Sequence, residues 1–379
     1  MSSTAPQATA MPMRALVARA VNQMAVETVL LDAPRPYEVL VRMRAAGVCH
    51  SDLHTLQGQL RATPPLVLGH EGAGVVVAAG ANVHHVKAGD PVLVNWVPAC
   101  NECPTCRRGL PNLCERLPLT TFQALLPDGT TRLHTQDGIA LKHFLSTATF
   151  AEFAVLDGAS VLPIPPSVPF EVAAVIGCAV ITGVGAVLNT AQARAGQSAA
   201  VIGCGGVGLS ALLGCLLAGC HPVVAVDTTL AKLDFARSLG ATHTLLAGPG
   251  VDVAAELKRI VPGGPDMVLD SVGASATIGQ ALDAARPGGS AVIMGLHGVR
   301  TPATINPGSL VYQNKRLLGS FFGQSRPQVD LPMLVELFRA GRLPVDRLIT
   351  QRFTLDEAPA ALAALDRGEV EGRAVILFA

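Results

Sequence analysis

From about Phe170 onward, short apolar stretches alternate with segments of helical periodicity, and this alternation constrains the fold more than any other feature. The strand-like stretches are "SAAVIGCGGVG", "HPVVAVD", "ATHTLLA", "PDMVLDSVG" and "GSAVIMGL", and helical segments separate them. Strands joined by helices lie parallel in one sheet, and the helices cover both of its faces. This part of the chain therefore predicts a doubly wound α/β domain.

The first of these strands runs into a glycine motif that is typical of dinucleotide-binding folds. Gly203, Gly205 and Gly208 form G-x-G-x-x-G, with Gly206 and Val207 inside it, and an apolar helix follows. Such glycines permit a tight turn and a close approach of the pyrophosphate to the helix N-terminus. The next strand ends in Asp227, and a carboxylate there binds ribose hydroxyls and repels a 2′-phosphate. We expect NAD rather than NADP; the alternative is a glycine turn that binds no nucleotide.

The residues up to about Pro166 have a different character and predict a mostly β region. Short runs such as "EVLVRMRAAGV", "GAGVVVAAG" and "DPVLVNWV" are separated by residues that favour turns. After about Gly323 the chain returns to helical segments and closes with the strand-like "RAVILF". A length of 379 residues is comfortable for two domains.

Four cysteines lie close together in "CNECPTCRRGLPNLC", at positions Cys100, Cys103, Cys106 and Cys114. Closed sets of four thiolates are typical of structural zinc sites. Disulfides and an iron–sulfur cluster are the alternatives. A reducing compartment disfavours disulfides, and the bacterial ferredoxin run ends in cysteine followed by proline, whereas Glu115 follows Cys114. The loop has little apolar material, so we expect the metal to supply its folding energy.

A second group of metal-binding residue types is spread over three segments. Cys49 and His70 lie in turn-like stretches, "GVCHSDLH" and "LGHEGAG", and Cys178 lies in "GCAVITG". Three such ligands and one exchangeable position are typical of catalytic zinc. Asp52 would hold the non-ligating nitrogen of His70, and Glu71 would approach the metal. Taken singly, a cysteine is more often a buried apolar group, and a histidine more often a surface or core residue; Cys204, Cys215 and Cys220 are expected only to pack.

The composition argues against partners of several kinds. The chain carries 28 basic and 28 acidic residues, so its net charge gives no reason to expect nucleic acid or an anionic membrane, and a zinc-ribbon nucleic-acid binder is disfavoured. Two apolar stretches, 172–188 and 207–220, are shorter than the roughly 20 residues of a membrane span, so we expect buried helices. Residues 1–12 lack the features of a signal peptide and predict a disordered tail, and we expect a cytoplasmic protein.

With these motifs assembled, the chain from about Met13 to Ala379 resembles the zinc-dependent alcohol dehydrogenases of the medium-chain dehydrogenase/reductase superfamily. The motifs that carry the resemblance are "GVCHSD", "GHEGAGVV", the four-cysteine loop, "GCAVITGVGAVLNTA", "VIGCGGVGLS", "VVAVD" and "GRAVILF". The resemblance implies a GroES-like β catalytic domain, 13–177 and 324–379, with a structural zinc lobe, 96–116. It also implies a Rossmann NAD-binding domain, 178–323.

The resemblance further implies individual roles, residue by residue. It implies a catalytic zinc held by Cys49, His70 and Cys178, with Glu71 as an acid that replaces a leaving water. It implies a proton relay from Ser51 to His54 through the nicotinamide ribose, and it places Trp96 in the wall of the substrate pocket. The implied cofactor contacts are Thr182 beside the nicotinamide, Lys232 with Asp227 around the adenosine ribose, Arg373 on the pyrophosphate, and His50 where many relatives have arginine.

The expected activity is hydride transfer between a small-molecule alcohol, primary and aliphatic or aromatic, and NAD, with two zinc ions per chain. The polar segment Leu117–Thr149 resembles the longer insert of a branch that includes thiol-dependent formaldehyde dehydrogenases. That branch makes S-(hydroxymethyl) thiol oxidation the alternative, and it favours a homodimer over a homotetramer. An alternative of another class is a non-catalytic NAD-binding or redox-sensing protein.

Overall fold

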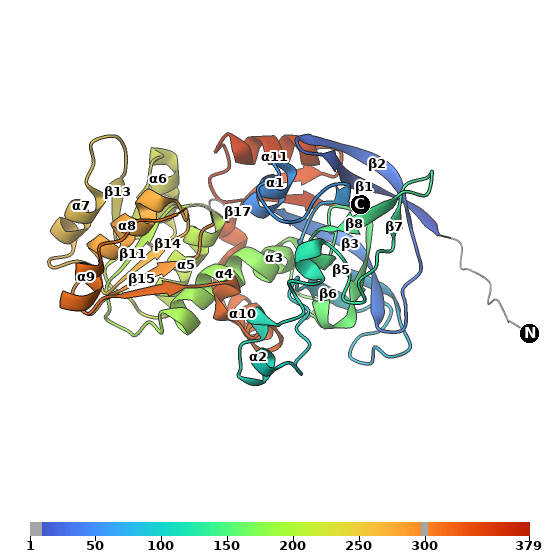
Figure 1. Cartoon of the computed structure of the whole chain (residues 1–379), viewed down its shortest axis with the longest axis horizontal. Coiled ribbons are helices and arrows are strands. Elements are labelled where there is room, and N and C mark those ends of the chain that lie inside the picture. The colour runs from blue at the N-terminus through green and yellow to red at the C-terminus, as the bar shows by residue number, and fades with distance from the viewer. Residues whose placement is uncertain (1–9, 297–301) are drawn as a thin grey trace, which may run out of the picture. The chain divides into compact units, whose positions relative to one another are not determined.

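The computed structural model describes residues 10–296 and 302–379, and the chain divides into two compact units (Figure 1). Unit 1 comprises 1–177, 352–367 and 374–379, and unit 2 comprises 178–351 and 368–373. The exact domain boundaries expected from the sequence stay a prediction. The expected tail, residues 1–12, needs one correction, because Met11 and Pro12 already belong to the first strand; residues 1–9 lie outside the described part.

Unit 1 is built on two β structures. A closed barrel has the order β1-β2-β7-β8-β4, and a seven-stranded sheet has the order β10-β6-β5-β3-β18-β17, with β9 paired to β3. The barrel strands are β1 (Met11–Ala20), β2 (Gln23–Leu31), β4 (Leu66–Val67), β7 (Leu133–His134) and β8 (Ala140–His143). The sheet strands are β3 (Glu38–Val48), β5 (Glu71–Ala79), β6 (Pro91–Val94), β9 (Phe153–Asp157), β10 (Val161–Pro163), β17 (Ile349–Thr354) and β18 (Arg373–Leu377).

Buried apolar residues explain these strands. In β1, Ala15 and Val17 are fully buried and contribute with Val29 and Leu133 to the core cluster of the barrel. In β3, Val39, Val41 and Met43 are fully buried, as expected for residues that alternate toward one face of a sheet. The helices of this unit are α1 (His50–Leu56), α2 (Pro104–Arg107), α3 (Phe170–Val175) and α11 (Ala358–Asp366).

Unit 2 contains a six-stranded sheet in the order β13-β12-β11-β14-β15-β16, and each neighbouring pair is parallel. This is the 3-2-1-4-5-6 order of a dinucleotide-binding fold, so the predicted doubly wound sheet is confirmed. Its strands are β11 (Ala199–Ile202), β12 (Val223–Asp227), β13 (His243–Leu246), β14 (Met267–Asp270), β15 (Ser290–Ile293) and β16 (Arg316–Gly319).

Helices cover this sheet, as Figure 1 shows for α5, α6 and α8. The helices are α4 (Ile181–Gly185), α5 (Gly206–Leu217), α6 (Leu230–Ser238), α7 (Val253–Ile260), α8 (Ser275–Ala284), α9 (Pro307–Tyr312) and α10 (Pro327–Arg339). The central strands read as continuous apolar runs because both of their faces are buried. Val224 and Val268, for example, are 0% exposed.

One helical stretch, Phe170–Thr190, is long and apolar enough to cross a membrane by length and composition. However, 83% of its most apolar window is buried inside the structure. The stretch contains α3, a π-helical turn at Ile176–Val180, α4 and a second π-helical turn at Ala186–Thr190. We therefore interpret it as a core helix, in agreement with the expectation from the sequence.

Candidate active site

The four clustered cysteines converge in the loop around α2. The ligand atoms of Cys100, Cys103, Cys106 and Cys114 all lie within 4.8 Å of one another. The Sγ atoms of Cys100 and Cys114 are 3.5 Å apart, and those of Cys100 and Cys106 are 4.0 Å apart. Disulfide sulfurs lie about 2.05 Å apart, whereas tetrahedral ligands with Zn–S bonds of about 2.3 Å lie roughly 3.8 Å apart. The spacing therefore fits a zinc ion and not a disulfide.

Backbone amides favour the ionised form of two of these sulfurs, those of Cys100 and Cys103. The N–H of Cys103 donates to Cys100 Sγ at 3.3 Å, and the N–H of Cys106 donates to Cys103 Sγ at 3.4 Å. Amide donors, from Glu115 and from Cys106, lower the pKa of Cys103 to about 6. Burial instead raises the pKa of Cys106. A lobe that already holds part of its sulfur as thiolate suits a metal, because only the thiolate is a ligand.

The second cluster starts from the pairing of β3 with β5. Cys49 directly follows β3 and is the N-cap of α1, while His70 directly precedes β5 and Glu71 opens it. These strands are antiparallel, with Gly47 opposite Glu71. The pairing brings the end of one strand beside the start of the other, so residues about 20 positions apart meet without any local sequence pattern.

Cys178 joins this cluster from the helix that begins with α3. That helix packs against β3, β5 and β6, and a Cβ on Gly177 would lie 2.5 Å from the carbonyl oxygen of Val94. The helix widens into the π-helical turn Ile176–Val180, which contains Cys178; such turns occur frequently at functional sites. The ligand atoms of Cys49, His70, Glu71 and Cys178 lie within 4.8 Å of one another, and all four residues are buried.

A buried carboxylate orients the imidazole of His70. Asp52 Oδ1 lies 3.3 Å from His70 Nδ1 and accepts the backbone N–H of Gly69 at 2.9 Å. Burial disfavours the charged ring, but the Asp52 carboxylate outweighs it and raises the pKa of His70 well above its ordinary value. Nε2 of His70 is buried and has no hydrogen-bond partner among the described residues. A nitrogen held in this way beside two thiols fits a zinc ion, which would compete with the proton.

Gly47 makes room for the Glu71 carboxylate, a role that the sequence did not suggest. A Cβ on Gly47 would lie 2.0 Å from Glu71 Oε2, far inside van der Waals contact. Glu71 is 0% exposed. The acid is therefore enclosed beside the other three donors because its neighbour on β3 has no side chain.

The remaining predicted residues of unit 1 lie around this cluster. Ser51 is on α1, and its Oγ lies 3.7 Å from Cys49 Sγ. His54 lies in the last turn of the same helix and is half-buried, while His50 at its start is exposed. Trp96 is 7% exposed, and its ring meets that of His70 edge-on at 6.2 Å.

In unit 2 the glycine motif occupies the turn between β11 and α5. Gly203 has φ +88°, and a Cβ on Gly208 would lie 1.8 Å from the carbonyl oxygen of Gly203. A Cβ on Gly205 would meet nothing within 4 Å, so open space faces this position beside the N-terminus of α5. This fits a pyrophosphate, which binds such a terminus through backbone N–H groups.

Asp227 ends β12 and faces the same turn. Its Oδ2 accepts the backbone N–H of Cys204 at 2.7 Å, and its Oδ1 accepts that of Thr229 at 3.0 Å. The Cys204 thiol is only packed, as expected, and burial raises its pKa to about 12.

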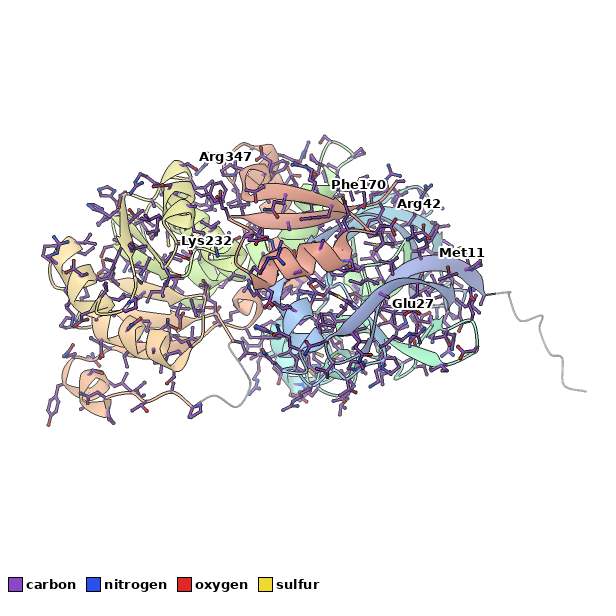
Figure 2. All side chains as sticks on the ribbon, turned by 90° about the horizontal axis from the view of Figure 1, so that it is seen from above. Met11, Glu27, Arg42, Phe170, Lys232 and Arg347 are labelled. Atoms are coloured by element: carbon purple, nitrogen blue, oxygen red, sulfur yellow. The ribbon has the colours of Figure 1, made fainter. Side chains whose placement is uncertain are left out.

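Three further residues that were predicted to bind the cofactor belong to unit 2. Arg373 is buried, and a Cβ on Gly206 would lie 2.3 Å from Arg373 Cδ. The side chain of Arg373 therefore lies against the first residue of α5, because Gly206 leaves room for it. Lys232 lies on α6, where it is half-buried (Figure 2). Thr182 lies on α4 and is 9% exposed.

Other residues beside the second cluster carried no signal in the sequence. Phe144 contacts the His70 ring edge-on at 5.4 Å, and Thr149 Oγ1 donates to the carbonyl oxygen of Glu71 at 2.9 Å. Both lie in the segment Leu117–Thr149, from which the sequence analysis predicted only a resemblance to one branch of the family. Long-range contacts of this type leave no local periodicity from which to infer them.

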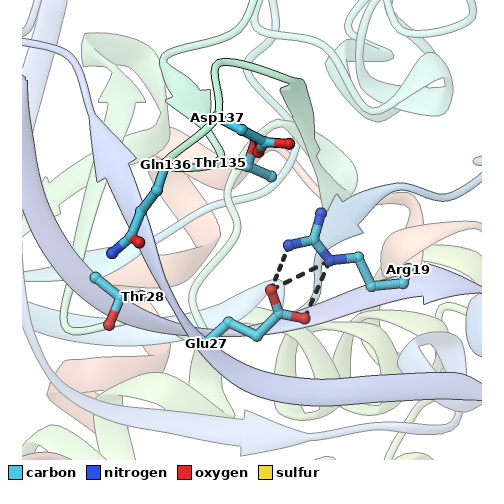
Figure 3. Close-up of a pocket in the computed structure, with 6 residues that line it drawn as sticks. All are labelled: Arg19, Glu27, Thr28, Thr135, Gln136 and Asp137. Carbon is cyan, nitrogen blue, oxygen red and sulfur yellow. Dashed lines mark hydrogen bonds and ion pairs between the residues drawn. The ribbon is translucent and has the colours of Figure 1, made fainter.

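A surface pocket elsewhere in unit 1 contains none of the predicted site residues (Figure 3). It is lined by Arg19, Glu27, Thr28, Thr135, Gln136 and Asp137. Arg19 Nε donates to Glu27 Oε1 at 3.0 Å, so the cation of the pocket is already neutralised. We assign no function to it.

Comparison with known proteins agrees with this geometry. Residues 35–166 match the family described as "Alcohol dehydrogenase GroES-like domain", and residues 206–339 match "Zinc-binding dehydrogenase". An alcohol dehydrogenase class-3 of Cereibacter sphaeroides is 36% identical over 96% of this chain and 99% of that relative. An S-(hydroxymethyl)glutathione dehydrogenase of Paracoccus denitrificans is 35% identical over the same shares, 96% and 99%.

Among solved structures, the benzyl alcohol dehydrogenase of Acinetobacter calcoaceticus has a TM-score of 0.91. It is 29% identical, and the match covers 97% of this chain and 100% of that one. The likeness of fold therefore extends over both units.

Proposed function

Because the chain belongs to the zinc-dependent alcohol dehydrogenases of the medium-chain dehydrogenase/reductase superfamily, we propose that its substrates are primary alcohols and the matching aldehydes. The protein is an oxidoreductase with NAD and zinc as cofactors. The observation that carries the proposal is the buried cluster of Cys49, His70, Glu71 and Cys178. The non-catalytic alternative is set aside because the relatives are dehydrogenases.

We assign the two thiolates and the imidazole of this cluster as the zinc ligands. Cys49, His70 and Cys178 supply the sulfur and nitrogen donors typical of catalytic zinc, and Glu71 supplies a carboxylate within reach. When bound, zinc acts as a Lewis acid that lowers the pKa of the substrate hydroxyl. Asp52 holds the ring of His70 in the orientation that directs Nε2 into the cluster.

Ser51 and His54 are proposed to move the proton of the hydroxyl. Ser51 Oγ lies 3.7 Å from Cys49 Sγ, so an alcohol beside that ligand is within reach of its hydroxyl. His54 is three residues further on α1 and therefore on the same face of the helix. Because His54 is half-buried, it can pass a proton on to solvent. A neutral imidazole accepts that proton near pH 7.

Most of the cofactor contacts are proposed for unit 2, with NAD as the hydride carrier. Gly203, Gly205, Gly206, Val207 and Gly208 form the turn that would receive the pyrophosphate, and Arg373 lies against it. Asp227, with Lys232, would bind the adenosine ribose and reject a 2′-phosphate. Thr182 beside the nicotinamide and His50 on the phosphates complete the proposed contacts.

The preference for primary alcohols rests on Trp96. Its ring is edge-on to His70 and almost fully buried, so a large rigid surface lies next to the proposed metal ligand. A substituent on the carbinol carbon would need room beside that surface. The likeness to a benzyl alcohol dehydrogenase supports aromatic as well as aliphatic substrates. Steady-state kinetics on paired primary and secondary alcohols test this, and faster turnover of the secondary series contradicts it.

The second candidate is oxidation of S-(hydroxymethyl) thiol adducts of formaldehyde. Relatives that are 34–35% identical are named S-(hydroxymethyl)glutathione dehydrogenase, and these names favour this candidate at least as strongly. Formaldehyde oxidation is measured with and without glutathione or mycothiol. A strict requirement for the thiol, with poor turnover of benzyl alcohol and other primary alcohols, selects this candidate.

The experiment that tests the metal assignment combines zinc content per chain with NADH formation on a panel of alcohols. We expect two zinc ions and NAD-dependent turnover. A single zinc per chain, or turnover unaffected by removing all zinc, would contradict the proposed metal assignment.

We also propose a cytoplasmic homodimer. No disulfide links cysteines among the described residues, which agrees with a reducing compartment. Strand β16 is the edge of the six-stranded sheet, and beside it in sequence Val311 and Tyr312 are 75% and 92% exposed. An open sheet edge and apolar side chains suit association with a second copy. Analytical ultracentrifugation distinguishes the dimer from a tetramer or a monomer, and cell fractionation tests the location.

A further inference from the structure

The segment Phe144–Thr149, here called the buttress, has an unusual backbone. Leu145, Ser146 and Ala148 have φ values of 48°, 60° and 59°, which is the left-handed region that residues other than glycine rarely adopt. Conformations of this kind persist only where the surroundings determine them, and they cluster at functional sites. The surroundings of the buttress are therefore informative.

The buttress is tied to the backbone on both sides of His70. Thr147 Oγ1 lies 3.0 Å from the carbonyl oxygen of Gly69, and the backbone N–H of Thr149 donates to the same oxygen at 3.0 Å. Thr149 Oγ1 donates to the carbonyl oxygen of Glu71 at 2.9 Å. The peptide group immediately before His70 and the one immediately after Glu71 are thus both held by threonines.

Close packing restricts movement of the backbone where the buttress meets Gly69. Gly69 has φ +94°, and a Cβ there would lie 2.3 Å from the backbone nitrogen of Phe150 and 2.7 Å from Thr149 Oγ1. Phe144, at the start of the buttress, contacts the His70 ring edge-on at 5.4 Å. Thr147, Thr149 and His70 are all 0% exposed, so no water competes for these hydrogen bonds.

The buttress is itself anchored away from the cluster. Ser146 Oγ donates to the carbonyl oxygen of Leu125 at 2.5 Å and lies 3.1 Å from Thr121 Oγ1. The chain of contacts therefore runs from the segment 121–125, through the buttress, to the backbone that carries His70 and Glu71. It approaches His70 from a different segment than Asp52, which holds the ring nitrogen.

We propose that Thr149, assisted by Thr147, is a positioning residue that holds His70 and Glu71 in the geometry that retains the catalytic zinc. The inference rests on the proposed assignment of that zinc to Cys49, His70 and Cys178. Partners that orient metal ligands without touching the metal typically change metal affinity by roughly 10–100-fold. Thr149 acts at the backbone, so loss of its hydroxyl loosens the backbone that carries His70 and Glu71 while leaving every ligand atom in the chain.

The test is the rate of zinc release to a chromogenic chelator from the full-length holoenzyme. Thr149→Val removes the hydroxyl at nearly constant volume, and we expect one zinc per chain to leave roughly tenfold faster. The zinc of the four-cysteine lobe is an internal reference, because general unfolding would speed the release of both ions. Thr149→Ser keeps the hydroxyl and should restore the slow rate.

Thr55→Val is the matched control. Thr55 is 0% exposed, and its hydroxyl has no hydrogen-bond partner among the described residues, so the same chemical change should leave the release rate unaltered. Equal rates for Thr149→Val and the unmodified chain overturn the inference, as does a rate that Thr149→Ser fails to restore. If Thr149→Val does not fold, Thr147→Val is measured in the same way. An unmodified chain that binds a single zinc instead refutes the underlying metal assignment.

Discussion

The two cysteine-containing clusters of this chain reach similar donor geometry by opposite routes. The four-cysteine lobe collects all its ligands from residues 100–114, and amides of the same loop stabilise its thiolates. The other cluster takes Cys49 from the end of β3, His70 and Glu71 from the start of β5, and Cys178 from a π-helical turn. Zinc binding at the first site would itself order the loop that carries the ligands. The second site requires that the strands and the helix that carry its ligands are already folded.

The donor sets of the two clusters also differ, because one set is closed and the other leaves a coordination position open. Four thiolates close a zinc tetrahedron and leave no place for a substrate. Two thiolates and one imidazole leave a position open, with a carboxylate beside it. The comparison predicts that changes in the first cluster reduce stability and changes in the second reduce turnover. The following variants are ordered by their expected effect on turnover.

Cys49→Ala should have the largest effect. Removing a proposed zinc ligand removes Lewis-acid stabilisation worth several kcal/mol, so we expect kcat/KM to fall by roughly 10³-fold or more. Zinc content, measured by mass spectrometry, should fall from two ions per chain to one. Cys215→Ala, which removes a buried thiol outside both clusters, should keep both ions. Full turnover in Cys49→Ala would contradict the catalytic role proposed for the second cluster.

Asp52→Asn should have an intermediate effect. The substitution keeps the shape of the side chain but removes the charge that faces His70 Nδ1. Partners of this type change metal affinity by roughly 10–100-fold, and we expect a weakening in this range in competition titrations against a chelator. Asp356→Asn, at an exposed ion pair with Arg14, serves as the control. Unchanged affinity in Asp52→Asn would mean that packing alone orients His70.

Asp227→Asn tests whether the nucleotide site and the metal site are independent. It weakens a charged acceptor that faces the glycine turn, and hydrogen bonds to charged groups contribute about 1.5–3 kcal/mol. We expect the KM for NAD to rise roughly tenfold, with the preference over NADP reduced and zinc content unchanged. Asp234→Asn, on the exposed face of α6, should alter neither value. A loss of zinc in Asp227→Asn would show that the two sites are not independent.

Cys106→Ser should have the smallest effect on turnover. We expect the lobe to lose its zinc and, with it, a source of folding energy, so that Tm falls by about 10 °C. Below the unfolding temperature kcat/KM should change by no more than about twofold. Calorimetry and kinetics on the same preparation check both values. A large loss of turnover without unfolding would show that the four-cysteine lobe contributes to catalysis.

The comparison also explains what the sequence could predict. The lobe follows from ligand spacing alone, because its geometry is local. The parallel sheet follows from the alternation of strands and helices after Phe170, and the glycine turn follows from Gly203, Gly205 and Gly208. Cys49, His70 and Cys178 were indicated as candidate zinc ligands by their residue types, and the resemblance to a family implied the same three ligands.

Other features could not be predicted, because they depend on tertiary contacts. The closed barrel of unit 1 pairs β1 with β4 and β2 with β7, across separations that no local periodicity reveals. The left-handed backbone at Leu145, Ser146 and Ala148 occurs without glycine, so nothing in "FLSTA" predicts it. The tail was predicted to be too long because Met11 and Pro12, which look irregular in sequence, pair with Leu31 and Leu30.

The space that Gly47 leaves for Glu71 has an evolutionary consequence. A methyl group at position 47 would overlap the carboxylate of Glu71, so the two positions cannot change independently. A lineage that exchanged the acid for a shorter residue could afterwards acquire a side chain at position 47, and the acid could then return only after that side chain was lost. The acid thus keeps position 47 a glycine for as long as the acid is present, and a side chain gained there afterwards would make loss of the acid hard to reverse.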